Sequence, residues 1–263
     1  MVIYHNINPT IFDFGDIEIR WYGLFYVIGF IIAYFFLSYL VKLKRMKLGK
    51  EQIVDFLGYA AIGVIVGGRL GYVLFYDISY YLDNPLKIFA VWEGGMSFHG
   101  GLIGVMISGF VFCKKNRVEF YELADISVVP ITLGLALGRI GNFINGELYG
   151  RPTSIGLCID YSKNTYIANP PRGCRWPSQL LESAKNLLIF STLWFIKDKN
   201  LPKGFLFYTF IAMYGGLRFA IEFVRQPDPQ IGLIFGFTEG QLLCLPMFLF
   251  GTFMLFRLKR KNI

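Results

Sequence analysis

The sequence from Ile126 to Gly150 reads ISVVPITLGLALGRIGNFINGELYG, an apolar run that ends in a cluster of polar residues. Ionisable residues at the end of a membrane-length apolar segment are costly, so they mark a candidate functional site. Side chains three, four and seven positions apart share one face of a helix. We therefore expect Arg139, Asn142 and Gly146 on one face, where the glycine would leave room for a close approach.

This face combines a fixed positive charge with amide donors. The guanidinium of an arginine is a planar fork of N–H groups that matches a phosphate, whereas lysine offers only a point charge. The pattern predicts a phosphate-binding face at the end of a membrane helix. The alternative is a helix-end cap in which Arg139 and Glu147 form a structural salt bridge.

The composition favours a membrane protein. Of the 263 residues, 54% are hydrophobic and only 17% are charged, against about a quarter in a soluble domain. Apolar segments recur near or above the ~17–25 residues that a membrane-spanning helix needs. We expect an all-α polytopic membrane protein with one transmembrane domain over residues 1–263. We expect no cleavable signal peptide, because no basic start followed by an apolar core precedes Glu18.

Seven apolar segments are candidate spans. They are Trp21–Val41, Ile53–Tyr76, Phe98–Phe112, Ile126–Ile144, Leu180–Ile196, Gly204–Val224 and Gln241–Phe256. Fifteen of the 26 Lys and Arg residues follow the first, third, fifth and seventh segments. Cytoplasmic loops are enriched in these residues, so the pattern predicts an N-terminus outside and a C-terminus inside. The net charge of +8 then reflects orientation in a membrane, and we expect no nucleic-acid partner.

The longest loop, residues 151–177, is predicted to form a small extracytoplasmic head. It contains Cys158 and Cys174, and a disulfide between them is permitted outside the cytoplasm; the alternative is two free thiols. Cys113 and Cys244 fall at or in spans and are expected to pack as small apolar residues. The chain has two histidines and no CxxC motif, so we expect no metal site and no cofactor.

Small residues recur at every fourth position in three of the spans. Such rows let membrane helices pack closely, and this interpretation is favoured over a ligand-binding role. The rows are Gly63, Gly67 and Gly71; Gly100, Gly104 and Ser108; and Gly134 and Gly138.

A second polar constellation is Arg218, Glu222 and Arg225, which spacings of four and three place on one helix face. The alternative interpretation is that Glu222 simply holds both arginines. Arg218 lies deeper in its span, where an idle guanidinium would cost ~2.5–3.5 kcal/mol. No adjacent acidic residue fully accounts for Arg139 or Arg218, so we expect them to share one phosphate-binding pocket.

Two further features border the apolar spans. His99 is followed by two glycines that open space around it, and a neutral imidazole there could take up a proton near neutral pH. A lone histidine is more often a satisfied polar residue. Trp21-Tyr22-Gly23 is, on the residues alone, best explained as part of an interfacial aromatic belt.

Several motifs occur together and in order. They are Trp21-Tyr22-Gly23, residues 67–72 (GGRLGY), residues 94–101 (GGMSFHGG), Gly138–Gly150, Pro177-Ser178-Gln179-Leu180 and residues 222–228 (EFVRQPD). Together they resemble the prolipoprotein diacylglyceryl transferase family over almost the whole chain, from about Trp21. The sequence departs from the family pattern at Trp176, commonly histidine, and at Leu181, commonly tyrosine.

The resemblance implies a transferase of lipoprotein biosynthesis in the cell inner membrane, with its site toward the outer face. Phosphatidylglycerol would enter from the bilayer among membrane lipids. The lipobox cysteine of a preprolipoprotein would attack the glycerol carbon that carries the phosphate ester. The diacylglyceryl group would end on sulfur as a thioether, and glycerol-1-phosphate would leave.

The resemblance also implies which residues form the site. We expect His99, Arg139 and Arg218 to be catalytic, with either His99 or an arginine activating the thiol. The expected substrate-binding residues are Tyr22, Arg69, Gly100, Asn142, Asn145, Glu147, Gly150, Glu222 and Arg225.

Two other function classes fit parts of the sequence. A transporter or channel for an anionic solute would also bury arginines, but transporters often show internal repeats and none is visible. A non-catalytic lipid-binding scaffold would not need His99 together with two deep arginines. The family resemblance favours the enzyme.

Overall fold

The computed structural model describes residues 2–15, 18–75, 77–156, 158–227, 233–234 and 236–260. The chain forms two compact units. The first comprises Met1–Phe36 and Ala124–Ile263, and the second comprises Leu37–Leu123.

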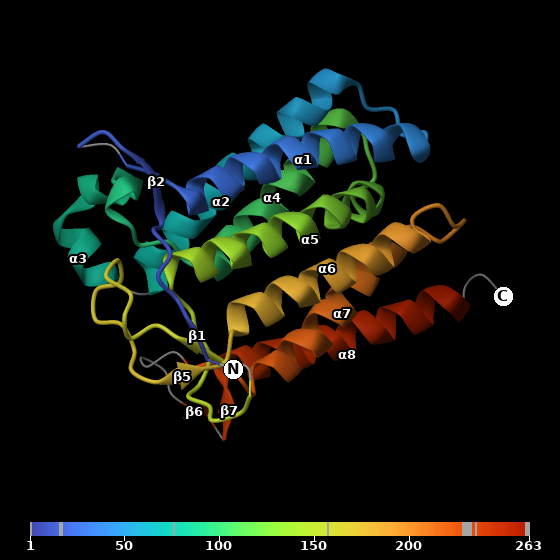
Figure 1. The fold of residues 1–263 in the computed structure, drawn as a ribbon. Helices are drawn as coiled ribbons and strands as arrows, with labels where there is room; N and C mark the ends of the chain where they lie inside the picture. Colours follow the sequence, from blue (N-terminus) through green and yellow to red (C-terminus); the bar gives the residue numbers. More distant parts are fainter. Residues whose placement is uncertain are drawn as a thin grey trace. The chain divides into compact units, whose positions relative to one another are not determined.

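Each predicted apolar segment coincides with a helix, although Gly204 and residues 222–224 of the sixth segment lie outside it. The long helices of the described residues are α1 (Trp21–Leu43), α2 (Lys50–Phe75), α4 (Phe98–Asn116), α5 (Phe120–Asn145), α6 (Ser178–Ile196), α7 (Phe205–Ile221) and α8 (Glu239–Arg260), shown in Figure 1. The predicted segment end at Tyr76 lies outside the described residues. The helices α1, α2, α5 and α8 are long and apolar enough to cross a membrane. The chain is therefore a membrane protein.

The expectation of an all-α fold needs correction, because short strands flank the helices. Strand β1 (Val2–Tyr4) pairs in parallel with β4 (Cys158–Asp160), which pairs antiparallel with β5 (Cys174–Arg175). Two hairpins are formed by β2 (Thr10–Asp13) with β3 (Glu18–Arg20) and by β6 (Leu233–Ile234) with β7 (Phe237–Thr238). Strands of two to four residues are too short for a period-two pattern to reveal them.

The predicted disulfide between Cys158 and Cys174 is confirmed. It joins β4 to β5 across a Cα–Cα distance of 5.4 Å and a sequence separation of 16 residues. Cys113 and Cys244 are free and buried, as expected for small apolar residues. The head loop is thus covalently closed on its own short sheet.

Breaking this bond is expected to destabilise the head. A disulfide that closes a loop of this size contributes ~3 kcal/mol in the chain-entropy model, so Cys158→Ser should lower the midpoint of thermal unfolding in detergent by several degrees. Alkylation of denatured, unreduced protein should label Cys113 and Cys244 alone. Labelling of all four cysteines would contradict the bond.

His5 ties the N-terminal segment to the end of α5. Its buried ring lies 2.7 Å from the Phe143 carbonyl through Nε2 and 2.7 Å from the Asn164 side-chain amide through Nδ1. A carbonyl can only accept, so Nε2 carries the hydrogen and Nδ1 accepts from Asn164. Burial lowers the pKa of His5, which favours this neutral form. The N-terminal segment and the head loop are therefore both anchored beside the polar end of α5.

In the second unit, α2 and α4 pack through their glycine rows, as predicted. A Cβ added at Gly67 would lie 2.8 Å from the Cα of Gly104, and one added at Gly71 would lie 2.7 Å from the Cα of Gly100. Gly134 lies at a contact with α1, because a Cβ added at Gly29 would lie 3.8 Å from the Cα of Gly134. At Gly138 an added Cβ would meet nothing within 4 Å among the described residues, so the structure shows no close packing there.

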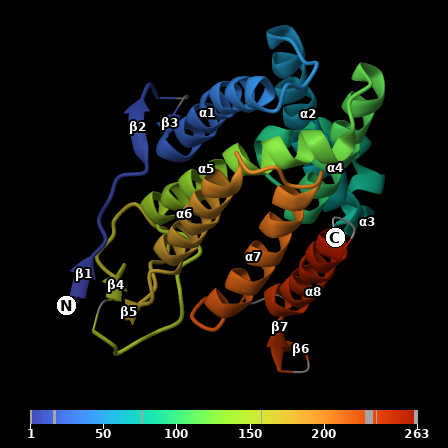
Figure 2. The ribbon, with the colours of Figure 1, turned by 90° about the vertical axis from the view of Figure 1, so that its right-hand side faces the viewer.

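In the first unit, α6, α7 and α8 run side by side in both views (Figures 1 and 2). Glycines again set the spacing: a Cβ at Gly215 of α7 would lie 2.7 Å from the backbone nitrogen of Phe248 in α8. Asp125 of α5 accepts hydrogen bonds from the backbone of Gly204 and Phe207 at 2.7 and 2.8 Å, which satisfies donors at the start of α7. These contacts fix α7, the helix that carries Arg218.

Candidate functional site

The end of α5 is built by a glycine turn. Gly146 has φ +66°, and its N–H donates to the Phe143 carbonyl at 3.0 Å while that of Glu147 donates to the Asn142 carbonyl at 3.1 Å. This is the Schellman arrangement that ends helices at a glycine. Gly146 therefore lies just beyond the helix and not on its face, and the close approach expected at this glycine is made by the side chain of Ile167. An added Cβ would lie 2.9 Å from Cγ1 of Ile167, so the space is filled.

The turn brings Glu147 back toward the last turn of α5. The side-chain amides of Asn142 and Asn145 both donate to Oε1 of Glu147, at 2.8 and 3.1 Å. Gln179 of α6 donates to the Glu147 backbone carbonyl at 2.7 Å. Two asparagines predicted to bind substrate thus fix the carboxylate of a third predicted residue.

Tyr22 of α1 lies against the same part of α5. A Cβ at Gly141 would lie 2.7 Å from Cδ2 of Tyr22, so the missing side chain lets the ring approach the helix. The Tyr22 hydroxyl is 3.1 Å from that of Tyr26 and lies near both Arg139 and Glu147. Tyr22 is therefore part of this polar cluster as well as of the aromatic start of α1.

Gly150 joins the end of α5 to the end of α7. Its N–H donates to the Trp176 carbonyl at 2.9 Å, and it forms a β-bridge with Arg225. A Cβ at this position would lie 2.6 Å from Cβ of Trp176 and 2.7 Å from the carbonyl of Val224. Only glycine fits between these two backbones, so the role of Gly150 is to permit a close approach.

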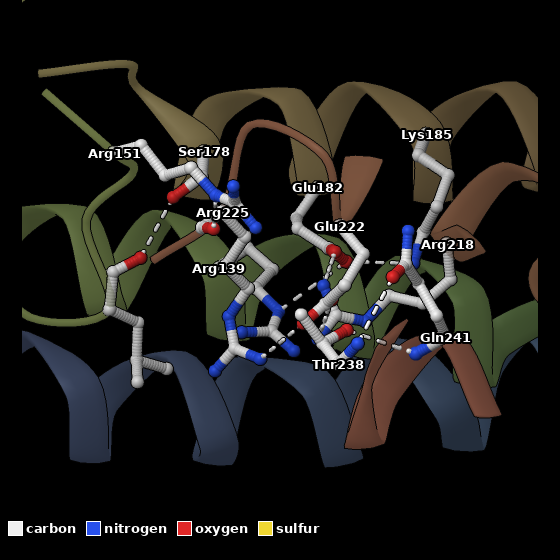
Figure 3. Close-up of polar contacts among 11 residues, drawn as sticks. Arg139, Arg151, Ser178, Glu182, Lys185, Arg218, Glu222, Arg225, Thr238 and Gln241 are labelled. Atoms are coloured by element: carbon white, nitrogen blue, oxygen red, sulfur yellow. Dashed lines mark hydrogen bonds and ion pairs between the residues drawn. The ribbon is translucent and has the colours of Figure 1, made fainter. Parts of the chain in front are cut away.

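A buried charged cluster lies among α5, α6 and α7 (Figure 3). Arg218 contacts a carboxylate oxygen of Glu182 through Nη1 and lies 2.9 Å from Oε2 of Glu222 through Nη2. Arg225 lies 3.6 Å from Oε1 of Glu222, so Glu222 pairs with both arginines at and just after the end of α7, as the spacing of the three residues predicted. The sequence predicted that no adjacent acidic residue fully balances the charge of Arg218. This is wrong, because Glu182 and Glu222 both pair with it.

Glu182 also pairs with both Arg139 and Arg218. The Arg139 Nε atom is 3.9 Å from Oε2 of Glu182, although the two arginines are far apart in the sequence. Lys185, one turn along α6, places Nζ 2.7 Å from that same oxygen. Neither Glu182 nor Lys185 was predicted from the sequence. They could have been found from the sequence, because two ionisable residues inside an apolar segment are unusual.

The cluster has an excess of positive charge. Among the described residues, ion pairs join four cations to two carboxylates, a formal excess of two positive charges within this set: Arg139, Lys185, Arg218 and Arg225 with Glu182 and Glu222. Buried charge of one sign is costly unless a partner balances it. The cluster is therefore suited to an anion that binds between helices. The Arg139 side chain, 21% exposed against 1% for that of Lys185, is the more open contact for such an anion.

Glu222 is held from a second side by α8. A Cβ at Gly240 would lie 2.8 Å from Oε1 of Glu222, so the carboxylate packs against the first turn of that helix. Thr238 and Gln241 satisfy each other's backbone N–H groups at 3.1 and 3.2 Å, the reciprocal pattern of a capping box. These contacts favour a structural role for Glu222, which orients Arg218 and Arg225.

The other predicted residues belong to the second unit. His99 is the exposed second residue of α4, behind Ser97, whose hydroxyl accepts from the Gly100 N–H at 3.3 Å. Arg69 donates to the carbonyls of Ile88 at 2.8 Å and Gly95 at 3.2 Å, and also to those of Lys87 and Gly94. Arg69 thus orders the loop before α4, and Gly100 packs against α2. Contact of His99, Arg69 and Gly100 with substrate stays a prediction, and the last residue of the 222–228 motif, Asp228, lies outside the described residues.

A membrane protein with an arginine-rich, positively charged cluster between its helices belongs to the class that handles anionic molecules within the bilayer. Within this class, the family model for prolipoprotein diacylglyceryl transferase matches residues 9–257. The chain belongs to that family.

The chain also matches curated relatives over almost their full length. Three of them are named phosphatidylglycerol–prolipoprotein diacylglyceryl transferase. The protein of Geobacter sulfurreducens is 46% identical over 99% of this chain and 98% of its own length. That of Francisella tularensis subsp. novicida is 42% identical over 100% and 98%, and that of Coxiella burnetii strain RSA 331 is 43% identical over 97% of both chains.

Proposed function

We propose that this chain transfers the diacylglyceryl group of phosphatidylglycerol to the lipobox cysteine of a preprolipoprotein. The relatives' names supply the two substrates. Among this chain's own residues, one observation supports the proposal most strongly. Arg139 and Arg218 both pair with Glu182, inside a cluster with more cations than carboxylates among the described residues. A phospholipid phosphate is an anion that two arginine forks can bind together.

The chemistry requires a nucleophile and a stabilised leaving group. The cysteine thiol loses its proton, which His99 accepts in the proposed mechanism, because the thiolate is the nucleophile. The sulfur then forms a bond to the glycerol carbon as the bond from that carbon to the phosphate oxygen breaks. Glycerol-1-phosphate leaves with the bonding electrons. Arg139 and Arg218 stabilise the charge that develops on the phosphate in a site sheltered from water.

The remaining predicted residues shape this site. In the proposed arrangement, Glu147 is fixed by Asn142 and Asn145 and borders the headgroup together with Tyr22. The backbone approach at Gly150 keeps the end of α7 beside the end of α5. We propose that residues 1–263 form a single transmembrane catalytic domain.

We further propose that all seven long helices cross the cell membrane, with the N-terminus outside and the C-terminus inside. The alternation of basic clusters supports this orientation. The disulfide-closed head loop then lies on the outer face, where disulfides persist. The active site opens toward the same face, where the preprolipoprotein cysteine is presented.

Reporter fusions test this topology. Fusions at Lys47, Lys115 and Lys199 should all report a cytoplasmic location, because each lies in a basic cluster that follows an odd-numbered span. A fusion at Ser162, in the head loop, should report the outside. An outside signal at any of the three lysines would contradict the span count.

The direct test of the activity uses purified protein, phosphatidylglycerol and a peptide that contains a lipobox cysteine. The peptide should gain the mass of one diacylglyceryl group on sulfur, and glycerol-1-phosphate should appear in equal amount. Uptake of an anionic solute into liposomes without such a product would instead indicate a transporter.

A further inference from the structure

Lys185 is a buried cation that the proposed chemistry does not use. Its side chain is only 1% exposed, and its Nζ lies 3.8 Å from the centre of the Tyr214 ring. Its ion-pair partner is Oε2 of Glu182, at 2.7 Å. A desolvated ammonium group inside a membrane helix is costly, so its place in the cluster calls for an explanation.

The two oxygens of Glu182 have different partners. Oε1 contacts Arg218, while Oε2 is 2.7 Å from Lys185 and 3.9 Å from Nε of Arg139. A separation of 3.9 Å is beyond hydrogen-bond range. Lys185 therefore makes the close contact with this oxygen, whereas Arg139 lies farther from it and is the more exposed of the two side chains.

We propose that Lys185 is a positioning residue that holds the Glu182 carboxylate away from Arg139 and so keeps Arg139 available for the phosphate of phosphatidylglycerol. This proposal rests on the proposed function and deepens it. Lys185 acts through Glu182 and does not itself contact the lipid.

The consequence of losing Lys185 follows from charge and distance. Oε2 of Glu182 would lose its closest partner in a buried site, where an unsatisfied carboxylate oxygen is unfavourable. Arg139 would need to move by only about 1 Å to form a hydrogen bond with it. The cluster would also lose one positive charge. The phosphate would then have to displace a carboxylate from Arg139 before it could bind.

Lys185→Met keeps the length of the side chain and removes its charge. We expect its KM for phosphatidylglycerol to rise about tenfold with kcat changed by less than about twofold, because binding is weakened equally in the ground and transition states. Adding Glu182→Gln should bring KM back toward the wild-type value, since a neutral amide does not trap Arg139. The two substitutions should therefore be strongly non-additive.

A matched control lies at the end of the same helix. Lys197 is also buried, with Nζ 2.7 Å from Asp198 and 3.9 Å from the Trp194 ring centre. Lys197→Met removes a similar ion pair and ring contact away from the cluster, so it should leave KM unchanged. Lys185→Arg retains the charge and should bind phosphatidylglycerol with near-normal KM, which provides a second variant if Lys185→Met does not fold.

The outcomes separate this proposal from the proposed function. A raised KM in Lys185→Met that is absent in Lys197→Met and reversed by Glu182→Gln supports the positioning role. An unchanged KM in folded Lys185→Met, an equal rise in Lys197→Met, or a raised KM in Lys185→Arg would overturn it. Absence of transfer by the wild-type protein would instead overturn the proposed function itself.

Discussion

Replacing Arg218 by lysine is expected to reduce transferase activity by about 10²–10³-fold, the cost of losing one aligned donor to a developing oxyanion. Lysine keeps the positive charge that Glu182 and Glu222 require, so the fold should survive. It cannot reproduce the planar fork that binds a carboxylate and a phosphate together. Arg139→Lys should have a similar effect for the same reason.

The measurement is the rate of diacylglyceryl transfer at saturating phosphatidylglycerol, with the thermal unfolding midpoint as the check on folding. Arg20→Lys is a suitable control, because Arg20 forms an exposed ion pair with Glu18 at 2.6 Å, outside the cluster. Normal turnover by folded Arg218→Lys or Arg139→Lys would contradict the assignment of both arginines.

The second large effect is expected at His99. His99→Gln should lower kcat at neutral pH by about 10²–10⁴-fold, the usual contribution of a general base, while binding of phosphatidylglycerol is retained. A free cysteine ionises with a pKa of about 8.5. The activity of the variant should therefore recover as the pH is raised toward and above that value, because the thiolate then forms without a base.

The chain contains one other histidine, which provides the control. His5→Gln removes the contacts to Phe143 and Asn164 and should lower the unfolding midpoint without a comparable loss of kcat. If His99→Gln turns over normally at neutral pH, the thiol is activated by the arginines instead. A loss that does not recover at high pH would also contradict proton transfer by His99.

Much of the fold followed from the sequence because its signals are local. Apolar segments located every long helix, and the four-residue spacing of Gly67 and Gly71 indicated close helix packing, which the structure shows between α2 and α4. The order Arg218, Glu222, Arg225 placed three side chains on one face, and the structure pairs them through Glu222. Two cysteines in one predicted outer loop were enough to predict their bond.

The parts that were missed depend on contacts between elements. Helical spacing relates residues on one helix, so it could not bring Glu182 and Lys185 of α6 to the arginines of α5 and α7. Gly146 was predicted on a helix face because helical spacing does not show where a helix ends. In the structure α5 ends at Asn145, and Gly146 forms the turn that follows. Arg69 was predicted to bind substrate from the family resemblance, and that role stays a prediction. The backbone carbonyls that surround it come from a loop that shows no periodicity, so these contacts could not be predicted.

The most direct test of the central claim is an experimental structure of the protein with phosphatidylglycerol bound. We expect the guanidinium groups of Arg139 and Arg218 both to lie within hydrogen-bond distance of one lipid phosphate, with Lys185 still paired to Glu182. A headgroup bound elsewhere, or the two arginines in separate cavities with no phosphate between them, would contradict it.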